Sequence, residues 1–363
     1  MIKDINYRDL DIIADNIING QKLTDDNLRE LLSLTEEEDI EKLQYVARKV
    51  RDHYFGNRVF LYSFVYFSTH CKNNCAFCYY NRCNEIQRYR LNLEEIRSIA
   101  RAIKNETIHM VDLTMGEDPY FHNNPEKFID VVKAVKEETG LPIMISPGVM
   151  DDRTLSRLHE NGANFLALYQ ETHDKELYRK LRVGQSFDER NHAREFARTN
   201  GYCVEDGILT GVGNDIESTI ISLRGMQKGQ PDMVRVMTFV PQEGTPLEQV
   251  SQESSLSELK IISVLRLMFP DKLIPASLDL EGIDGMVDRL NAGANVVTSI
   301  ISADSSLEGV VNYDRELEER DRDSKSVIRR LRTMGMEPAS QAEFNRIIEK
   351  QQGTPIRIPV AAL

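Results

Sequence analysis

Several features that would place this chain in a membrane, a secretory pathway or a nucleic-acid complex are missing from its sequence. No apolar run is long enough to cross a bilayer, and the start, Met1-Ile-Lys-Asp-Ile-Asn, lacks the pattern of a signal peptide. The formal net charge is −13, whereas binding to nucleic-acid phosphates needs a basic face. We therefore expect a cytoplasmic protein with no nucleic-acid and no membrane partner.

Cysteine is scarce and odd in number, with five in 363 residues. An odd count without a secretory leader argues against a disulfide framework, and cytoplasmic thiols stay reduced. Internal repeats and low-complexity tracts are also absent. The remaining composition, 41% hydrophobic and 28% charged, is typical of a globular chain.

From residue 59 onward, short β-rich runs alternate with amphipathic helical patterns. Alternation of this kind predicts a parallel sheet with helices outside it, and eight runs indicate a complete (β/α)8 barrel of the α/β class. The predicted strands are 59–67, 110–115, 142–146, 164–170, 203–210, 233–240, 273–280 and 295–301. The predicted helices are 92–105, 125–139, 151–161, 187–200, 215–227, 255–269, 283–292 and 323–335.

The chain is expected to have three parts. Residues 1–57 form an N-terminal helical extension on the bottom or the flank of the barrel, 58–303 form the barrel core, and 304–363 form a C-terminal segment that packs on the barrel. For the tail, 353–363, disorder and docking at the lower face both remain open. The length suits one large barrel domain with such additions.

Three cysteines stand directly after the first predicted strand. Cys71, Cys75 and Cys78 have the spacing C-x3-C-x2-C, and Phe77 precedes the last of them. One short loop with this spacing can hold three corners of a metal cluster. A [4Fe–4S] cubane usually takes four cysteines, so a set of three would leave one iron open to a reactive ligand.

A structural zinc site is the alternative for these cysteines. Cys83, or His70 beside the first cysteine, could complete a set of four ligands. Zinc sites, however, usually combine distant C-x2-C pairs or cysteine with histidine. Cys83 and Cys203 are better explained as ordinary apolar or surface residues than as ligands.

Polar residues follow the predicted strands at their C-terminal ends, where barrel enzymes collect their chemistry. Gly116 allows close approach of the backbone, although an ordinary turn would also explain it. Glu171 could bind a ligand or cap the next helix. Arg182 could form a two-pronged pair with a ligand carboxylate, or be a solvated arginine at a helix end. The other candidates at these ends are Glu117 and Ser146.

Four side chains are expected to point into the barrel lumen: Asp112, Arg235, Ser277 and Asp279. In the seventh strand, the two-residue period predicts that Ser277, Asp279 and Glu281 share the inner face, while Leu278 and Leu280 face the outer helices. A buried carboxylate is costly unless it meets a cation. For Asp112 that cation is either a ligand ammonium or Arg235.

The lumen residues together offer one cation, two carboxylates and a hydroxyl group. This set complements a molecule with one carboxylate and two ammonium groups, such as a lysine or ornithine skeleton. Arg235 and Ser277 would bind the α-carboxylate, and Asp112 and Asp279 would bind the two amines.

The pattern C-x3-C-x-aromatic-C resembles the signature of radical S-adenosylmethionine (SAM) enzymes. The resemblance implies a [4Fe–4S] cluster on Cys71, Cys75 and Cys78 whose open iron binds SAM. One electron from a separate, unidentified donor then cleaves SAM to methionine and a 5′-deoxyadenosyl radical. Because SAM carries the radical, no side chain is expected to be catalytic. The implied SAM contacts are Phe77, Gly116, Glu117, Ser146, Glu171 and Arg182, with Met115 in place of the first glycine of the family's Gly-Gly-Glu element.

Longer runs resemble one family within this superfamily, the methylornithine synthases of pyrrolysine biosynthesis, over about residues 20–345. That resemblance implies the conversion of L-lysine to (3R)-3-methyl-D-ornithine, by hydrogen abstraction at Cγ, cleavage of the Cα–Cβ bond and recombination. It also places Asp112, Arg235, Ser277 and Asp279 at the amino acid.

A monomer is expected. The alternatives are a radical SAM enzyme of the biotin synthase or hydrogenase-maturase type, and a zinc-stabilised binding protein. The runs are Tyr66–Asn81, Met110–Pro119, Gly201–Gly207, Val234–Phe239 and Ala276–Gly282.

Overall fold

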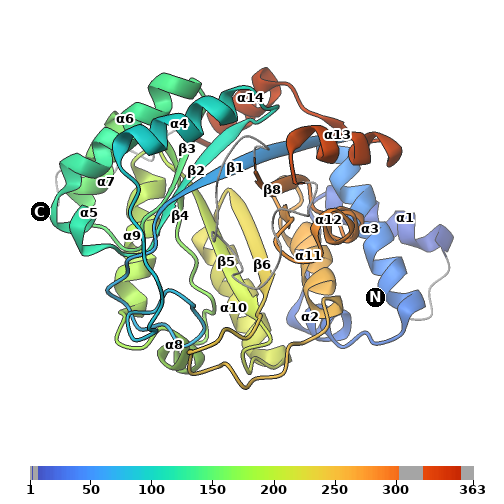
Figure 1. Cartoon of the computed structure of the whole chain (residues 1–363). Coiled ribbons are helices and arrows are strands. Elements are labelled where there is room, and N and C mark those ends of the chain that lie inside the picture. The colour runs from blue at the N-terminus through green and yellow to red at the C-terminus, as the bar shows by residue number, and fades with distance from the viewer. Residues whose placement is uncertain (1, 3–6, 302–321, 353–363) are drawn as a thin grey trace, which may run out of the picture.

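A parallel β-barrel forms the centre of the molecule (Figure 1). The computed structural model describes residues 2, 7–301 and 322–352. All neighbouring barrel strands are parallel, in the order β6-β5-β4-β3-β2-β1-β8-β7, which confirms the predicted α/β barrel class. The strands are β1 Arg58–Ser68, β2 Met110–Met115, β3 Ile143–Ser146, β4 Ala163–Ala167, β5 Cys203–Thr210, β6 Met233–Thr238, β7 Pro275–Ser277 and β8 Val296–Ile300.

The barrel is nearly rather than completely closed, because β6 and β7 meet only at one end. Their contact is a single bridge between Met233 and Leu273. There Val234 N donates to Leu273 O at 3.0 Å, and Leu273 N donates to Asp232 O at 3.2 Å. These bonds lie at the N-terminal ends of the strands, so the wall parts toward the C-terminal ends.

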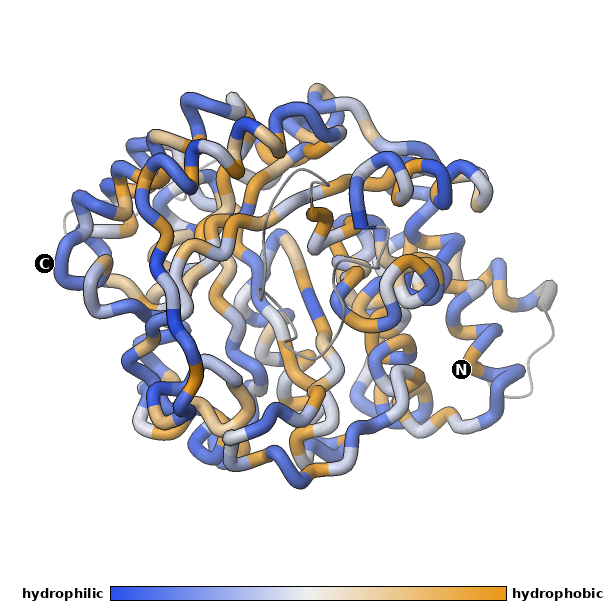
Figure 2. The backbone as a smooth tube through the Cα atoms, viewed as in Figure 1, coloured by the Kyte–Doolittle hydropathy of each residue, from blue (hydrophilic) through white to orange (hydrophobic). Residues whose placement is uncertain are grey.

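Helices cover the outside of the barrel, and hydrophobic and hydrophilic residues alternate along them (Figure 2). Local capping sets several of their starts; Asn92 accepts from Glu95 N while the Glu95 side chain accepts from Asn92 N, a capping box for α4. The outer helices are α4 Leu93–Lys104, α5 Pro119–Asn123, α6 Pro125–Thr139, α7 Asp152–Glu160, α8 Lys175–Leu181, α9 Phe187–Thr199, α10 Ile216–Gly229, α11 Leu256–Met268 and α12 Gly282–Asn291.

The N-terminal helices lie on the flank of the barrel, beside α11 and α12 (Figure 1). They are α1 Tyr7–Ile18, α2 Asp25–Leu32 and α3 Glu37–Phe55. Arg48 Nη1 donates to Asn291 O at 2.9 Å, and Lys260 Nζ donates to Leu32 O at 3.1 Å. Of the two positions considered for this extension, the flank is therefore the one observed.

The C-terminal segment closes the lumen at the end where the barrel strands begin, which is called the floor of the barrel. Its elements are α13 Ser324–Thr333, β9 Glu337–Pro338 and α14 Gln341–Gln352. β9 pairs with β1, and Phe344 and Ile348 of α14 pack against Phe60, Met110 and Phe165 inside the barrel floor. The tail 353–363, for which two alternatives were open, lies outside the described residues.

The seventh strand is shorter than predicted. The expected alternation holds as far as Leu278, in the outer core, and Asp279, which lines the pocket, and is wrong from Leu280 onward. Strand β7 ends at Ser277, and Glu281 then adopts a left-handed φ of 63° as the N-cap of α12. Leu280 consequently lines the pocket instead of facing the outer helices. The start of the helix turns the chain before an extended alternation can form.

Of the helices in the described part of the chain, none combines the length and the apolar character needed to span a bilayer.

Candidate active site

The cysteine loop leaves the C-terminal end of β1 and is pinned to two neighbouring segments. Lys72 N donates to Glu117 O at 3.0 Å, and Ala76 N donates to Leu181 O at 2.8 Å. Cys75 is buried, while Cys71 and Cys78 are half-buried. The loop is therefore held at the mouth of the barrel, at the strand ends that carry the other candidate residues.

The loop fits an iron–sulfur cluster by the groups that surround its sulfur atoms. Gln185 Nε2 lies 3.0 Å from Cys75 Sγ, Arg182 Nη1 lies 3.7 Å from the same sulfur, and Asn73 N lies 3.5 Å from Cys71 Sγ. Such N–H donors suit thiolates. Burial raises the pKa of the Cys78 thiol to about 12, so iron binding there has to displace a proton.

No three His, Cys, Asp or Glu side chains in the described ranges are grouped so that they could ligate a single ion. In a cubane, by contrast, each thiolate holds a different iron atom. Cys83 is exposed, and Cys203 lies in the barrel floor with Phe344. The three motif cysteines remain the set suited to a cluster.

Gly116 lies where a larger residue has no space. A Cβ atom at this position would be 2.4 Å from His70 O and 2.9 Å from Cys71 Cβ. The close approach predicted from this glycine is therefore already required by the cysteine loop itself. Contact of Gly116 with SAM stays a prediction.

Glu117 is buried between the ends of β2 and β3. Its carboxylate accepts from Val149 N at 3.2 Å and pairs with Lys72 Nζ at 3.4 Å and Arg190 Nη1 at 3.7 Å. Burial pushes the pKa of Glu117 up, but Arg190 and Lys72 together hold it below its ordinary value. The side chain is thus ionised and fixed. Its contact with SAM stays a prediction.

Glu171 and Arg182 form a buried ion pair. Arg182 Nη2 lies 2.5 Å from Glu171 Oε1, and the guanidinium carbon lies 5.5 Å from the centre of the Phe77 ring. Both non-ligand alternatives are wrong, because Asp174 caps α8 in place of Glu171 and Arg182 is only 8% exposed. Arg182 Nε is buried without a hydrogen-bond partner in the described part of the chain, which suits a ligand carboxylate.

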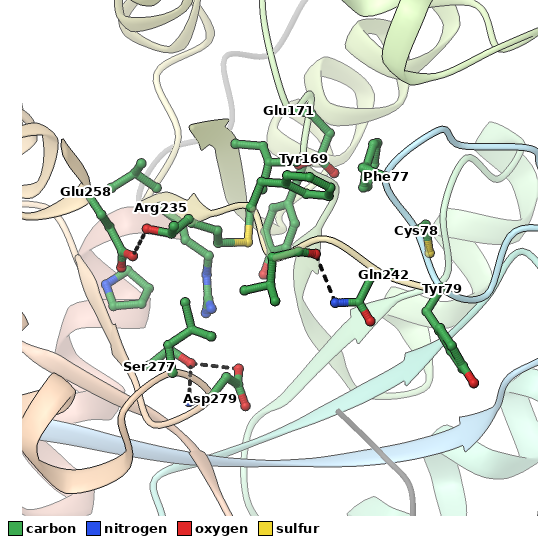
Figure 3. Close-up of a pocket in the computed structure, with 18 of the residues that line it drawn as sticks. Phe77, Cys78, Tyr79, Tyr169, Glu171, Arg235, Gln242, Glu258, Ser277 and Asp279 are labelled. Carbon is green, nitrogen blue, oxygen red and sulfur yellow. Dashed lines mark hydrogen bonds between the residues drawn. The ribbon is translucent and has the colours of Figure 1, made fainter. Parts of the chain in front are cut away.

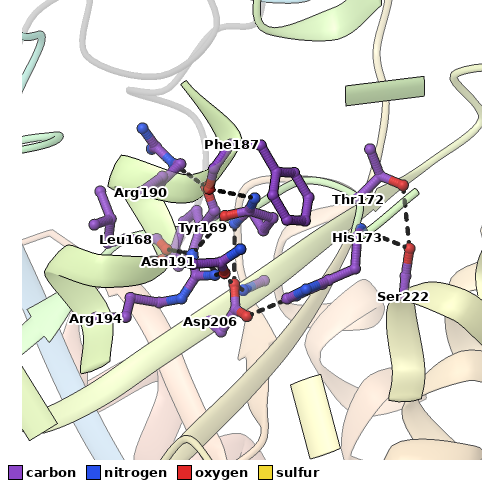
Figure 4. Close-up of polar contacts among 12 residues, drawn as sticks. Leu168, Tyr169, Thr172, His173, Phe187, Arg190, Asn191, Arg194, Asp206 and Ser222 are labelled. Atoms are coloured by element: carbon purple, nitrogen blue, oxygen red, sulfur yellow. Dashed lines mark hydrogen bonds and ion pairs between the residues drawn. The ribbon is translucent and has the colours of Figure 1, made fainter. Parts of the chain in front are cut away.

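A buried polar network holds the segment that carries Glu171 (Figure 4). Arg190 Nε donates to Tyr169 O at 2.6 Å, and Arg194 Nη1 donates to Leu168 O at 2.8 Å. His173 Nε2 lies 2.9 Å from Asp206 Oδ2. Burial opposes ionisation of Asp206, but Arg194 and His173 lower its pKa to about 2. The network fixes Glu171, whose φ of 65° is unusual for a residue other than glycine.

Arg235 lines the pocket in the lumen (Figure 3). It meets an anion, as predicted, but the anion is Glu205. Arg235 Nε lies 2.7 Å from Glu205 Oε1, its Nη2 donates to the Tyr62 hydroxyl, and Tyr169 Oη donates to Glu205 Oε2 at 3.1 Å. The contacts with Glu205 and Tyr62 use Nε and Nη2 of Arg235. Sequence reasoning missed Glu205, although the two-residue period from Cys203 placed it on the lumen face.

Asp112 is bound to Ser146, and not to Arg235. Ser146 Oγ donates to Asp112 Oδ1 at 2.9 Å, so the proposed internal pair with the arginine is wrong. Burial raises the pKa of Asp112 to about 6, against the effect of the Ser146 hydrogen bond.

Asp279 lies in a turn after β7 and is surrounded by donors. Ser277 Oγ and Ser299 Oγ donate to its Oδ2 at 2.7 and 2.8 Å. Arg322 Nη1 lies 3.4 Å from its Oδ1. Arg322 was not among the predicted residues, since it lies far along the chain and outside any strand pattern.

One pocket joins the cysteine loop to the lumen (Figure 3). It has a volume of about 310 Å³ and continues through the gap between β6 and β7 as far as the buried Glu258–Arg289 pair, whose closest atoms are 2.6 Å apart. Six predicted residues line it, namely Phe77, Cys78, Glu171, Arg235, Ser277 and Asp279. Seven others lie outside this lining: Cys71, Cys75, Asp112, Gly116, Glu117, Ser146 and Arg182.

Comparison with known proteins identifies the family. The profile of the radical SAM superfamily matches residues 65–222. The 3-methylornithine synthase of Methanosarcina acetivorans is 68% identical over 348 residues, which cover 96% of this chain and 99% of the relative. The crystal structure of methylornithine synthase (PylB) is 70% identical, with a TM-score of 0.89 over 92% of this chain and 99% of that one.

The chain belongs to the methylornithine synthase family of radical SAM proteins. A more distant relative also matches; the [FeFe] hydrogenase maturase subunit HydE of Thermotoga maritima is 31% identical over 76% of this chain and 80% of its own length. The hydrogenase-maturase alternative is not favoured, because HydE is 31% identical to this chain against 68% for the methylornithine synthase. The zinc-stabilised binding protein is not favoured either, because the chain matches the radical SAM superfamily.

Proposed function

We propose that this member of the methylornithine synthase family is an isomerase that converts L-lysine to (3R)-3-methyl-D-ornithine. The proposal is supported by 68% identity along nearly the whole chain and, independently, by the charges in the lumen. The structural observation that supports this function most directly is the group of ionisable side chains in the barrel lumen, deeper than the cysteine loop.

The lumen charges complement lysine. Among the described lumen residues, Arg235 and Arg322 are positive, and Asp112, Glu205 and Asp279 are negative, so the formal sum of these five is −1 when all are ionised. Lysine carries one carboxylate and two ammonium groups and therefore has a charge of +1. A buried set of charges is favourable only when its partners are present, so the lumen favours a ligand of this charge.

The four predicted substrate contacts divide by charge. Arg235 and Ser277 bind the α-carboxylate, and Asp112 and Asp279 bind the amines. Since Nε and Nη2 of Arg235 already contact Glu205 and Tyr62, Nη1 is the donor for the carboxylate. Holding both ends of the substrate keeps its fragments in place.

Cys71, Cys75 and Cys78 hold the [4Fe–4S] cluster in this proposal. The SAM contacts are Phe77, Gly116, Glu117, Ser146, Glu171 and Arg182. When bound, the cluster and SAM supply the radical that starts the reaction, with one electron from a separate donor. The buried Arg182 guanidinium lies beside the Phe77 ring, next to the cysteines, which suits a site that has to exclude water.

The carbon skeleton defines the substrate steps. Hydrogen leaves Cγ, the Cα–Cβ bond breaks into a glycyl radical and 4-aminobutene, and the glycyl radical adds back at the former Cγ. The resulting primary radical regains hydrogen and becomes the methyl group. No side chain has to give or take a proton, so the protein orients the reactants and retains both fragments.

Two substitutions test the assigned contacts. Arg235→Ala and Asp279→Ala should abolish methylornithine formation from lysine and SAM under anaerobic conditions, because each removes one end of the substrate clamp. Iron content should stay at the wild-type level. Asp284→Ala, at an exposed position of α12, is the control and should turn over normally. Normal turnover in both lumen variants would refute these roles.

Labelled substrate tests the abstraction site. Lysine deuterated at Cγ should transfer label into 5′-deoxyadenosine, which mass spectrometry detects. Transfer only from another carbon would overturn the proposed first step.

We also propose that the protein is a monomer and works in the cytoplasm. All five cysteines are unpaired thiols, which suits a reducing compartment. Light scattering of the reconstituted protein measures the assembly directly, and a dimer mass would contradict the proposal.

A further inference from the structure

Gln185 lies next to the cysteine loop and is not among the residues assigned to SAM or to the substrate. We infer that Gln185 is a positioning residue for the cluster: its side-chain amide donates to the Cys75 thiolate and so raises the reduction potential of the cluster held there. This inference rests on the cluster of the proposed function.

The contact itself is short and shielded. Gln185 Nε2 lies 3.0 Å from Cys75 Sγ. Cys75 is 6% exposed, so water competes little for the sulfur at this point. In such surroundings a hydrogen bond is electrostatically stronger than in water.

Arg182 fixes the direction of the amide. Arg182 Nη1 donates to Gln185 Oε1 at 3.2 Å, and a guanidinium has only donors. The oxygen of the Gln185 amide therefore faces Arg182, and its NH2 group faces the sulfur. Arg182 is itself held by Glu171 at 2.5 Å.

The backbone also holds the two partners together. Gln185 N donates to Arg182 O at 3.0 Å, in a turn where Gly184 has a φ of +75°. Directly afterwards, Ser186 caps α9. On the other side, Ala76 N donates to Leu181 O at 2.8 Å. Donor and acceptor thus sit on segments that are tied to each other.

The effect on the cluster follows from charge. A reduced [4Fe–4S] cluster carries one more negative charge than the oxidised form, so an N–H donor to a ligand sulfur stabilises the reduced form more. Hydrogen bonds to the sulfur atoms are among the factors that set such potentials. Removing the donor should make the cluster harder to reduce.

The experiment compares midpoint potentials of the anaerobically reconstituted protein, measured by EPR at stepped potentials without lysine. Gln185→Met keeps the length but removes the donor, and its potential should shift to a more negative value. Gln185→Glu adds a negative charge and should shift it further in that direction. Gln185→Lys restores a donor with a positive charge and should shift it the other way. Gln87→Met, at an exposed glutamine of the same loop, is the matched control and should leave the potential unchanged.

Equal potentials for wild type, Gln185→Met and Gln185→Glu at full iron content would overturn the inference. Loss of the cluster in every variant would also overturn it, since Gln185 would then serve only assembly. The test is separate from the proposed function. A wild-type protein that shows the cluster signal but forms no methylornithine would refute that function and leave this inference standing.

Discussion

Among single residues, Asp112 is a lumen group whose charge responds to pH in the physiological range. Burial raises its pKa to about 6, above the ordinary value of 3.8. Its contribution to folding stability is therefore largest below pH 3.8 and is lost as the pH rises through 6. A ligand ammonium offsets this cost, because it favours the ionised carboxylate.

Lysine binding should consequently strengthen as the pH rises. If the ligand binds the ionised form of Asp112, the apparent Kd should be about tenfold weaker at pH 5 than at pH 7. Calorimetry with lysine in the absence of SAM measures this.

The control is Asp112→Asn, in which binding should be weak throughout and should lose this dependence. A wild-type Kd that does not change between pH 5 and pH 7 would contradict the assigned amine contact.

At this scale the sequence indicated which residues face the lumen better than it indicated their partners. Arg235 was predictable because an arginine inside an apolar strand has to face an anion. Its partner Glu205 was missed, since pairing depends on how β5 and β6 stand beside each other. Arg322 was missed too. Because it and Glu205 have opposite charges, these two described residues together add no net charge to the four predicted ones.

Among the structural elements, the end of β2 and the cysteine loop depend on each other through Gly116. Gly116→Ala should displace the loop, because the new Cβ atom would lie 2.4 Å from His70 O. Backbone atoms cannot yield as a flexible side chain does. We expect the iron content after reconstitution to fall to less than about half of the wild-type value, as measured by iron assay and absorbance.

Gly229→Ala is the matched control, since a Cβ atom added there would meet no neighbouring atom within 4 Å. It should bind iron normally. Full iron content in Gly116→Ala would show that the loop can move without losing the cluster.

Element boundaries were predictable where the apolar pattern and the caps agree. The predicted strands 110–115 and 203–210 coincide with β2 and β5. The seventh strand was predicted too long, because the charges at Asp279 and Glu281 imitate an alternation that the turn into α12 interrupts. A two-residue period alone does not reveal where a helix begins.

For the molecule as a whole, α14 supplies a floor for the barrel. Phe344 is 1% exposed, and its ring centre lies 5.5 Å from that of Phe60 and 6.5 Å from that of Phe165. Phe344→Ala should reduce the free energy of unfolding by about 3–5 kcal/mol. Denaturant unfolding followed by circular dichroism measures the loss.

Leu93→Ala, at a side chain that is 40% exposed, is the comparison and should change stability by only about 0.5 kcal/mol. Similar losses for both substitutions would mean that α14 does not support the barrel.

The barrel class was predictable from the alternation of runs, but its incomplete closure was not. Sequence periodicity reports which face of a strand is apolar, and it carries no information on the partner strand. The gap between β6 and β7 arises because only Met233 and Leu273 bridge them, with a long connection in between.

A barrel that is closed at one end exchanges its ligands through the opposite end. Because α14 closes the N-terminal end of the described barrel, two ligands that share the other end have to bind one after the other. With the proposed contacts, the amino acid sits at the depth of Arg235 and the nucleoside near Phe77, so the amino acid is first in and last out.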